Sequence, residues 1–104
     1  MNQDFRDLLR ALSDAEARFL IVGAYAVSFH AEPRATGDLD IWIDATPENA
    51  ERVHRALAAF GAPLTELSVA DLTGPETVFQ IGVVPRRIDI LTSITGVTFA
   101  EAWP

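Results

Sequence analysis

Three aspartates occupy positions from which they could bind one divalent cation together. Asp38 and Asp40 lie two residues apart in the segment GDLDIWID, and Asp89 lies in a similar apolar segment, RRIDIL. Residues two apart in a β-strand project from the same face, so Asp38 and Asp40 are expected side by side, and Asp89 joins them if the two strands are neighbours. Carboxylates that converge in this way repel one another unless a cation lies among them. Mg²⁺ fits such a set, because it binds a few carboxylates and fills its other coordination positions with water and substrate phosphate oxygens.

The alternative for the Asp-X-Asp motif is an ordinary solvated strand face. Such a pair on an amphipathic strand is more often exposed to water than bound to a ligand. Aspartate is nevertheless a poor strand former, so two of them within one strand indicate a role beyond solvation. Trp42 is expected on the same face as Asp40, where it either covers the sheet or stacks on a nucleobase.

Residues that suit a phosphate group precede the aspartates. Gly23 follows the apolar segment RFLIV, and a glycine at a strand-to-helix turn lets backbone amides, here those of Gly23 and Ala24, approach an anion at the positive end of the helix. Arg34 supplies a positive charge and Thr36 a hydroxyl shortly before the aspartates. Taken singly, Gly23 could serve the turn alone and Arg34 could be a solvated loop residue.

The elements that would position these residues follow from the spacing of apolar side chains. Segments with apolar residues three and four apart are expected as helices, and short apolar segments rich in β-branched or aromatic residues are expected as strands. The expected helices are residues 3–17, 24–30 and 47–59, and the expected strands are residues 18–22, 38–44, 77–84 and 86–91. Alternation of apolar and polar residues in the strand at 38–44 predicts one buried face. The segment 64–76 is expected as a loop with one helical turn, and FAEAWP as the start of a further element.

The helix at 47–59 carries clear signals at both ends. Thr46 suits the N-cap, Pro47 the first helical position and Gly61 the C-terminal stop. The polar residues of this helix are expected on a solvated outer face: Glu48, Glu51, Arg52, His54 and Arg55.

The composition predicts a single soluble domain over residues 1–104, since 49% of the chain is hydrophobic. Fifteen acidic residues against eight arginines and no lysine give a net charge of −7, which disfavours a broad nucleic-acid-binding surface but not a metal-dependent enzyme. The absence of cysteine excludes a disulfide framework and a thiolate metal site. The longest apolar run, FLIVGAYAV, is about half of a membrane span, so a cytoplasmic protein without membrane contact is expected.

Taken in order, these features resemble the DNA polymerase beta-like nucleotidyltransferase superfamily, in particular its small bacterial members related to minimal nucleotidyltransferases and AbiEii-type toxins. The family pattern is an apolar residue followed by Gly and Gly or Ser, a helix, Asp-X-Asp on the next strand, and a third acid on a later strand. In this chain the pattern falls on residues 22–24, on Asp38 and Asp40, and on Asp89.

The resemblance implies an α/β (α+β) fold with a mixed sheet of about four strands flanked by helices. It implies two Mg²⁺ ions at the three aspartates and a nucleoside triphosphate whose phosphates lie near Gly23, Ala24, Arg34 and Thr36. The implied activity is transfer of a nucleoside monophosphate from the triphosphate to an acceptor hydroxyl, with release of pyrophosphate.

The resemblance leaves the partners open. Relatives modify RNA ends such as those of tRNA, proteins or small molecules, and some belong to toxin–antitoxin or defence systems. A cognate toxin or antitoxin partner, or a second copy of the chain, is therefore compatible with it. Relatives usually continue with further secondary structure, so the resemblance also predicts a domain truncated at its C-terminus.

Two other functions are compatible with the residues. Ala24 stands where the family has Gly or Ser, and together with the acidic surface it would suit a catalytically silent antitoxin or interaction module that keeps the fold, whereas the three acids favour an enzyme. A metal-dependent glycosyltransferase also holds a nucleotide diphosphate with Asp-X-Asp. Those enzymes are normally far longer and lack the third acid on a separate strand.

Overall fold

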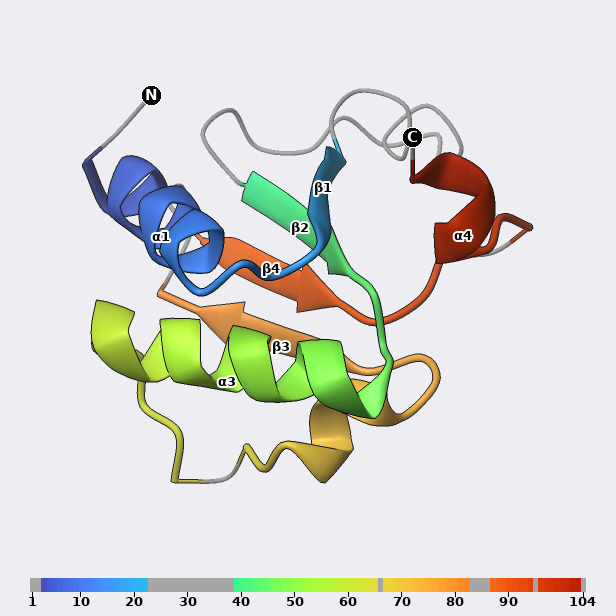
Figure 1. Ribbon diagram of the computed structural model, residues 1–104. Coiled ribbons are helices and arrows are strands. Elements are labelled where there is room, and N and C mark those ends of the chain that lie inside the picture. Colours follow the sequence, from blue (N-terminus) through green and yellow to red (C-terminus); the bar gives the residue numbers. More distant parts are fainter. Residues whose placement is uncertain (1–2, 23–38, 66, 83–86, 95, 104) are drawn as a thin grey trace.

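The computed structural model describes residues 3–22, 39–65, 67–82, 87–94 and 96–103. Its helices and strands follow one another along the chain as shown in Figure 1. In order they are α1 (Gln3–Asp14), β1 (Phe19–Val22), β2 (Leu39–Ile43), α3 (Pro47–Phe60), the 3₁₀ helix η1 (Ala70–Thr73), β3 (Val78–Ile81), β4 (Ile88–Leu91) and α4 (Phe99–Ala102).

The four strands form one mixed sheet in the order β1-β2-β4-β3. The two central strands, β2 and β4, are parallel, and each is flanked by an antiparallel edge strand: β1 pairs with β2, and β3 pairs with β4. Together with the helices that flank it, this sheet confirms the predicted mixed α/β (α+β) class. The parallel pair brings two segments far apart in the sequence into register.

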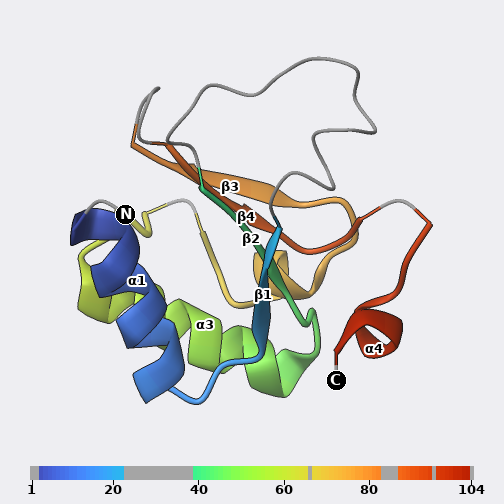
Figure 2. The same cartoon turned by 90° about the horizontal axis from the view of Figure 1, so that it is seen from above.

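Helices α1 and α3 lie on the same side of the sheet, as Figure 2 shows, and the hydrophobic core fills the space between the two layers. Alternate residues of the central strands enter this core, because side chains along a strand point to opposite faces. The fully or almost fully buried core residues include Leu8 and Leu12 of α1, Ile41 and Ile43 of β2, Val53 and Leu57 of α3, and Ile88 and Ile90 of β4. Burial of this apolar surface is the main driving force for the fold.

The prediction that β2 has a single buried face is wrong. All five residues of the strand are buried, including Asp40 and Trp42 on the face away from α1 and α3. Trp42 is covered there by Phe99 of α4, whose ring meets the indole edge-on at a centroid distance of 5.2 Å. A central strand with cover on both sides has no solvated face, so the aspartate in it is not an ordinary exposed side chain.

Helix α3 begins and ends where the sequence predicts. The Thr46 hydroxyl accepts a hydrogen bond from the Asn49 backbone N–H at 3.3 Å, Pro47 opens the helix, and Gly61 ends it in the left-handed conformation with φ of 97°. Glycine adopts that conformation without the steric cost that a Cβ imposes. Helix α1 ends at Asp14, earlier than predicted, because the chain turns at Glu16, which has a positive φ of 59°.

The side chain of Asn49 ties the start of α3 to the residues just before β1 and just after β2. Its carbonyl oxygen accepts from the Arg18 N–H at 2.6 Å, and its amide group donates to the carbonyl oxygens of Arg18 at 3.0 Å and Asp44 at 2.8 Å. Only 1% of Asn49 is exposed. These three bonds satisfy the Arg18 N–H and the carbonyl oxygens of Arg18 and Asp44 at the ends of the strands.

Part of the outer face of α3 is less solvated than predicted. The ring Nε2 of His54 lies 3.0 Å from the carbonyl oxygen of Leu67, so this histidine connects the helix to the following loop. Arg52 forms an ion pair with Glu48, one helical turn earlier, at 3.0 Å. The remaining polar residues of this face fit the predicted pattern, since Glu51 and Arg55 are exposed.

The element expected at FAEAWP is the short helix α4, which has a capping box at its N-terminus. The Thr98 hydroxyl accepts from the Glu101 N–H at 3.2 Å, and the Glu101 carboxylate accepts from the Thr98 N–H at 3.1 Å and from the Thr98 hydroxyl at 2.8 Å. These hydrogen bonds from Thr98 hold the pKa of Glu101 below its ordinary value. The box fixes the turn that places Phe99 over Trp42.

The helix predicted at 24–30 lies outside the described residues. The predicted helical turn within 64–76 is η1. No helix in the described ranges is both long and apolar enough to cross a membrane.

Candidate metal centre

Asp40 and Asp89 lie side by side on the face of the sheet opposite α1 and α3. They are direct partners in the register of the parallel strands β2 and β4. Neighbouring strands in a sheet are about 4.8 Å apart, so two carboxylates at partner positions lie within reach of one cation. The expectation that the strand of Asp89 neighbours the strand of Asp40 is therefore met.

Both aspartates are almost completely removed from solvent. The exposed fraction is 5% for Asp40 and 4% for Asp89. A buried carboxylate is costly unless its charge is compensated, and two adjacent ones also repel each other in a medium that screens charge less than water does. The sheet therefore holds a concentration of negative charge that its hydrophobic core does not require.

Apart from Gln80, the side chains that the register places around the two carboxylates on this face are apolar. The sheet register places the pair in a row that runs across all four strands from Val22 through Asp40 and Asp89 to Gln80. The next row, one pleat further along β2, contains Leu20, Trp42, Leu91 and Val78. Such neighbours lower the local dielectric constant, which strengthens attraction to a cation as well as repulsion between the acids.

Arg87 makes a two-pronged contact with Asp89. Its Nε donates to Oδ1 at 2.9 Å and its Nη2 donates to Oδ2 at 3.3 Å. The two residues are separated by one position, so their side chains project from the same side of the extended chain. The guanidinium side chain is 27% exposed and the carboxylate side chain 6%. No role was predicted for Arg87 from the sequence. Its position two residues before Asp89 could have indicated that the two side chains lie on the same face and pair.

Trp42 covers the sheet and is not available as a platform for a nucleobase. The residue is only 4% exposed, and Phe99 packs against its ring. Phe99 in turn stacks on Trp103 at a centroid distance of 5.4 Å. Of the two roles left open by the sequence for Trp42, the structure supports cover of the sheet.

The other predicted site residues lie outside the described part of the chain: Gly23, Ala24, Arg34, Thr36 and Asp38. Asp40 and Asp89 are the predicted site residues that the structure brings together. No group of three or more acidic, histidine or cysteine side chains that could hold a metal occurs within the described ranges. The observed pair nevertheless has the chemistry of a site for a hard cation, because carboxylate oxygen is the ligand that Mg²⁺ prefers.

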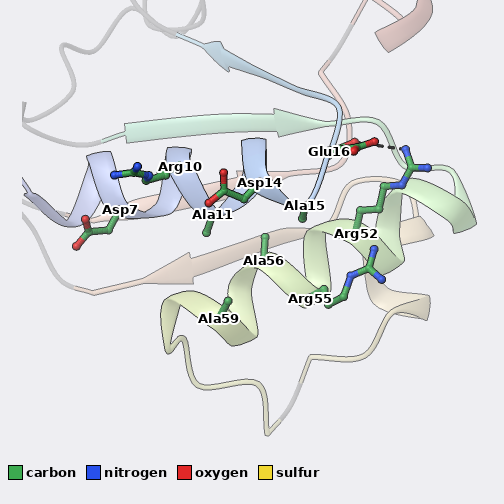
Figure 3. A pocket seen from close by; sticks show the side chains of 10 residues that line it. All are labelled: Asp7, Arg10, Ala11, Asp14, Ala15, Glu16, Arg52, Arg55, Ala56 and Ala59. Atoms are coloured by element: carbon green, nitrogen blue, oxygen red, sulfur yellow. Dashed lines mark hydrogen bonds between the residues drawn. The ribbon is translucent and has the colours of Figure 1, made fainter.

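An open groove of about 650 Å³ runs between α1 and α3, on the other side of the sheet from the aspartates. Figure 3 shows alanines from both helices along it, among them Ala11 and Ala56, with charged side chains of both signs around them. Arg52 extends there to the carbonyl oxygen of Glu16 at 3.3 Å. The mixture of charges favours no single class of ligand, and the carboxylates Asp40 and Asp89 do not contribute to this groove.

No protein-family model matches the sequence, and neither the curated proteins nor the solved structures compared with the chain contain a match.

Proposed function

We propose that the protein is a Mg²⁺-dependent nucleotidyltransferase that moves a nucleoside monophosphate from a nucleoside triphosphate to an acceptor hydroxyl. The observation that carries the proposal is the burial of Asp40 and Asp89 at partner positions on neighbouring parallel strands. A pair of buried acids weakens a fold, and apolar residues of similar size would stabilise the same positions. Binding of a divalent cation accounts for both the residue type and the placement.

In this reaction the acceptor oxygen forms a bond to the α-phosphorus, and the bond between the α-phosphorus and the oxygen bridging to the β-phosphate breaks, so that pyrophosphate leaves. Asp38, Asp40 and Asp89 would hold two Mg²⁺ ions, which supply Lewis-acid stabilisation of the charge on the phosphates. Asp89 would also take the proton that the acceptor hydroxyl loses.

The remaining predicted residues would orient the triphosphate. We assign this role to the backbone amides of Gly23 and Ala24, the guanidinium of Arg34 and the hydroxyl of Thr36, on the chemistry of these groups alone. Phosphoryl transfer depends mainly on positioning and on compensation of charge, so the chain needs no covalent intermediate.

The acceptor and the setting are part of the same proposal. We place the acceptor among RNA ends, protein hydroxyls and small molecules, and the protein in the cytoplasm, in a toxin–antitoxin or defence system. The net charge of −7 disfavours an extended contact with a phosphate backbone, so an RNA acceptor would be bound at its end only or with the help of a partner.

One observation favours a second candidate function, a catalytically silent module that keeps the nucleotidyltransferase fold for interaction with a partner. Arg87 already contacts both carboxylate oxygens of Asp89. In a silent module this ion pair would be permanent, and Asp89 would serve only the stability of the sheet.

Calorimetric titration of non-hydrolysable ATP, GTP, CTP and UTP, with Mg²⁺ and then with EDTA, tests the proposal. We expect at least one nucleotide to bind only with Mg²⁺, and we expect Asp40→Asn to abolish this binding because it removes a carboxylate from the cation. The matched control is Asp14→Asn, which changes an exposed aspartate at the end of α1 and should bind like the parent.

Two outcomes would contradict the proposed enzymatic function. Equal binding by the parent and by Asp40→Asn would show that the site is assigned wrongly. Mg²⁺-dependent binding without release of pyrophosphate from any of the four triphosphates, tested with RNA ends, proteins and small-molecule hydroxyls as acceptors, would favour the silent module.

A further inference from the structure

We propose that Arg87 is an internal counter-ion that occupies Asp89 in the metal-free protein and must release it before a divalent cation binds. This inference rests on the proposed function, since it assumes that Asp89 is a cation ligand. It goes further, because Arg87 belongs neither to the proposed metal ligands nor to the residues proposed to orient the triphosphate.

The first argument is the geometry of the contact. The Nε and Nη2 groups of Arg87 reach different oxygens of Asp89, at 2.9 Å and 3.3 Å. A guanidinium that contacts both oxygens of a carboxylate occupies one electron pair on each, which is about half of the acceptor positions of the group. A cation that binds the same two oxygens competes with the guanidinium for these positions and is also repelled by its charge.

The second argument is the difference in mobility between the backbone and the side chain of Arg87. The carbonyl oxygen of Arg87 accepts a hydrogen bond from the Leu39 N–H at 2.9 Å, so the backbone of Arg87 is joined to the start of β2. The side chain is 27% exposed and has several rotatable bonds. It can turn toward solvent while the register of β2 and β4 stays unchanged.

The third argument is electrostatic. Without a cation, Asp40 and Asp89 are buried side by side, and the positive charge of Arg87 reduces the cost of their proximity. With a cation bound to the pair, the same positive charge would be repelled from it. The preferred position of Arg87 therefore differs between the metal-free and metal-bound states.

These arguments predict opposite effects of Arg87→Gln on stability and on metal affinity. Loss of the guanidinium should lower the melting temperature of the metal-free protein, because the acids lose a counter-charge. It should also tighten Mn²⁺ binding about tenfold, since a charge-assisted hydrogen bond is worth roughly one factor of ten in an equilibrium constant and no longer has to be broken.

The experiment is a titration of Mn²⁺ followed by electron paramagnetic resonance of the free ion, together with melting curves with and without Mn²⁺. Mn²⁺ is the probe because it accepts the same oxygen ligands as Mg²⁺. Arg87→Lys keeps the charge but lacks the two-pronged contact, so its affinity should lie between those of the parent and Arg87→Gln. Arg52→Gln is the matched control: it removes an arginine from an ion pair with Glu48 on α3 and should leave Mn²⁺ affinity unchanged.

The outcomes separate this inference from the proposed function. Tighter binding by Arg87→Gln, or binding by this variant where the parent binds too weakly to detect, supports the counter-ion role. Unchanged or weaker binding by Arg87→Gln, while Asp40→Asn abolishes binding, overturns the role of Arg87 and leaves the metal site intact. Binding that survives both Asp40→Asn and Asp89→Asn, or no binding by any of the proteins, overturns the metal site and the counter-ion role together.

Discussion

At the scale of single residues, the protein places two buried acids side by side, and an arginine pairs with one of them. Asp40 and Asp89 are partners across the parallel strands, and the Arg87 guanidinium forms an ion pair with Asp89 at 2.9 Å. Removal of the Asp89 carboxylate therefore also removes this ion pair from the metal-free fold.

We expect Asp40→Asn to raise the free energy of unfolding of the metal-free protein by about 1 kcal/mol, because it removes the repulsion between the two acids while keeping the shape of the side chain. Asp89→Asn should lower it by a similar amount, since it removes the carboxylate that pairs with the Arg87 guanidinium at 2.9 Å. Urea denaturation in EDTA measures both values. A loss of stability in Asp40→Asn would show that Asp40 is stabilised by its surroundings and not strained by them.

The position of Asp40 and Asp89 was predictable because a strand has a period of two residues, and that period assigns each side chain to a face. The contact between Arg87 and Asp89 was not predictable. An arginine side chain can extend into water equally well, and it pairs with a carboxylate only where the register and burial of the strands favour the contact. Cover of the sheet was one of the two roles that the sequence left open for Trp42, but its partner Phe99 was not predictable, because it comes from a helix far away in the sequence.

At the scale of secondary-structure elements, α3 is held to the sheet by the polar side chain of Asn49 as well as by its apolar face. Asn49 contacts the chain just before β1 and just after β2, through Arg18 and Asp44. The caps of this helix were predictable from Thr46, Pro47 and Gly61, because capping depends on residues next to one another. The role of Asn49 was not predictable, since its partners flank two strands that only the folded sheet brings to the helix.

We expect Asn49→Leu to lower the free energy of unfolding by about 3 kcal/mol, because the part-buried Arg18 N–H and the carbonyl oxygens of Arg18 and Asp44 lose their hydrogen bonds to the side-chain amide. Chemical denaturation followed by circular dichroism measures the loss. Glu51→Ala, at an exposed position of the same helix, is the control and should change the stability by less than about 0.5 kcal/mol. A small loss in Asn49→Leu would mean that water replaces the amide at this junction.

At the scale of the whole molecule, the sheet has a well-covered centre and open edges. Ile41 in the central strand β2 and Ile21 in the edge strand β1 are partners in the antiparallel register, so they share a face of the sheet. Ile41 is fully buried, whereas Ile21 is 51% exposed. The sequence showed two isoleucines in apolar strands, and only the strand order distinguishes the centre from the edge.

We expect Ile41→Ala to cost about 3 kcal/mol, since it removes apolar surface from a fully packed core and leaves a cavity. Ile21→Ala should cost less than about 1 kcal/mol, because solvent already reaches this side chain. Thermal unfolding of the two variants compares the positions directly. A large loss in Ile21→Ala would indicate that a second chain or a further segment covers β1 in solution.

The parallel pairing of β2 with β4 also has a consequence for the order of events during synthesis. Between these strands the chain must form α3, η1 and β3, so β4 reaches its place beside β2 only after most of the described elements have left the ribosome. Closure of such a long loop is slow compared with the formation of local helices. Until it closes, Asp40 has no Asp89 beside it, and a nascent chain that ends before β4 cannot bind any ligand that requires both carboxylates.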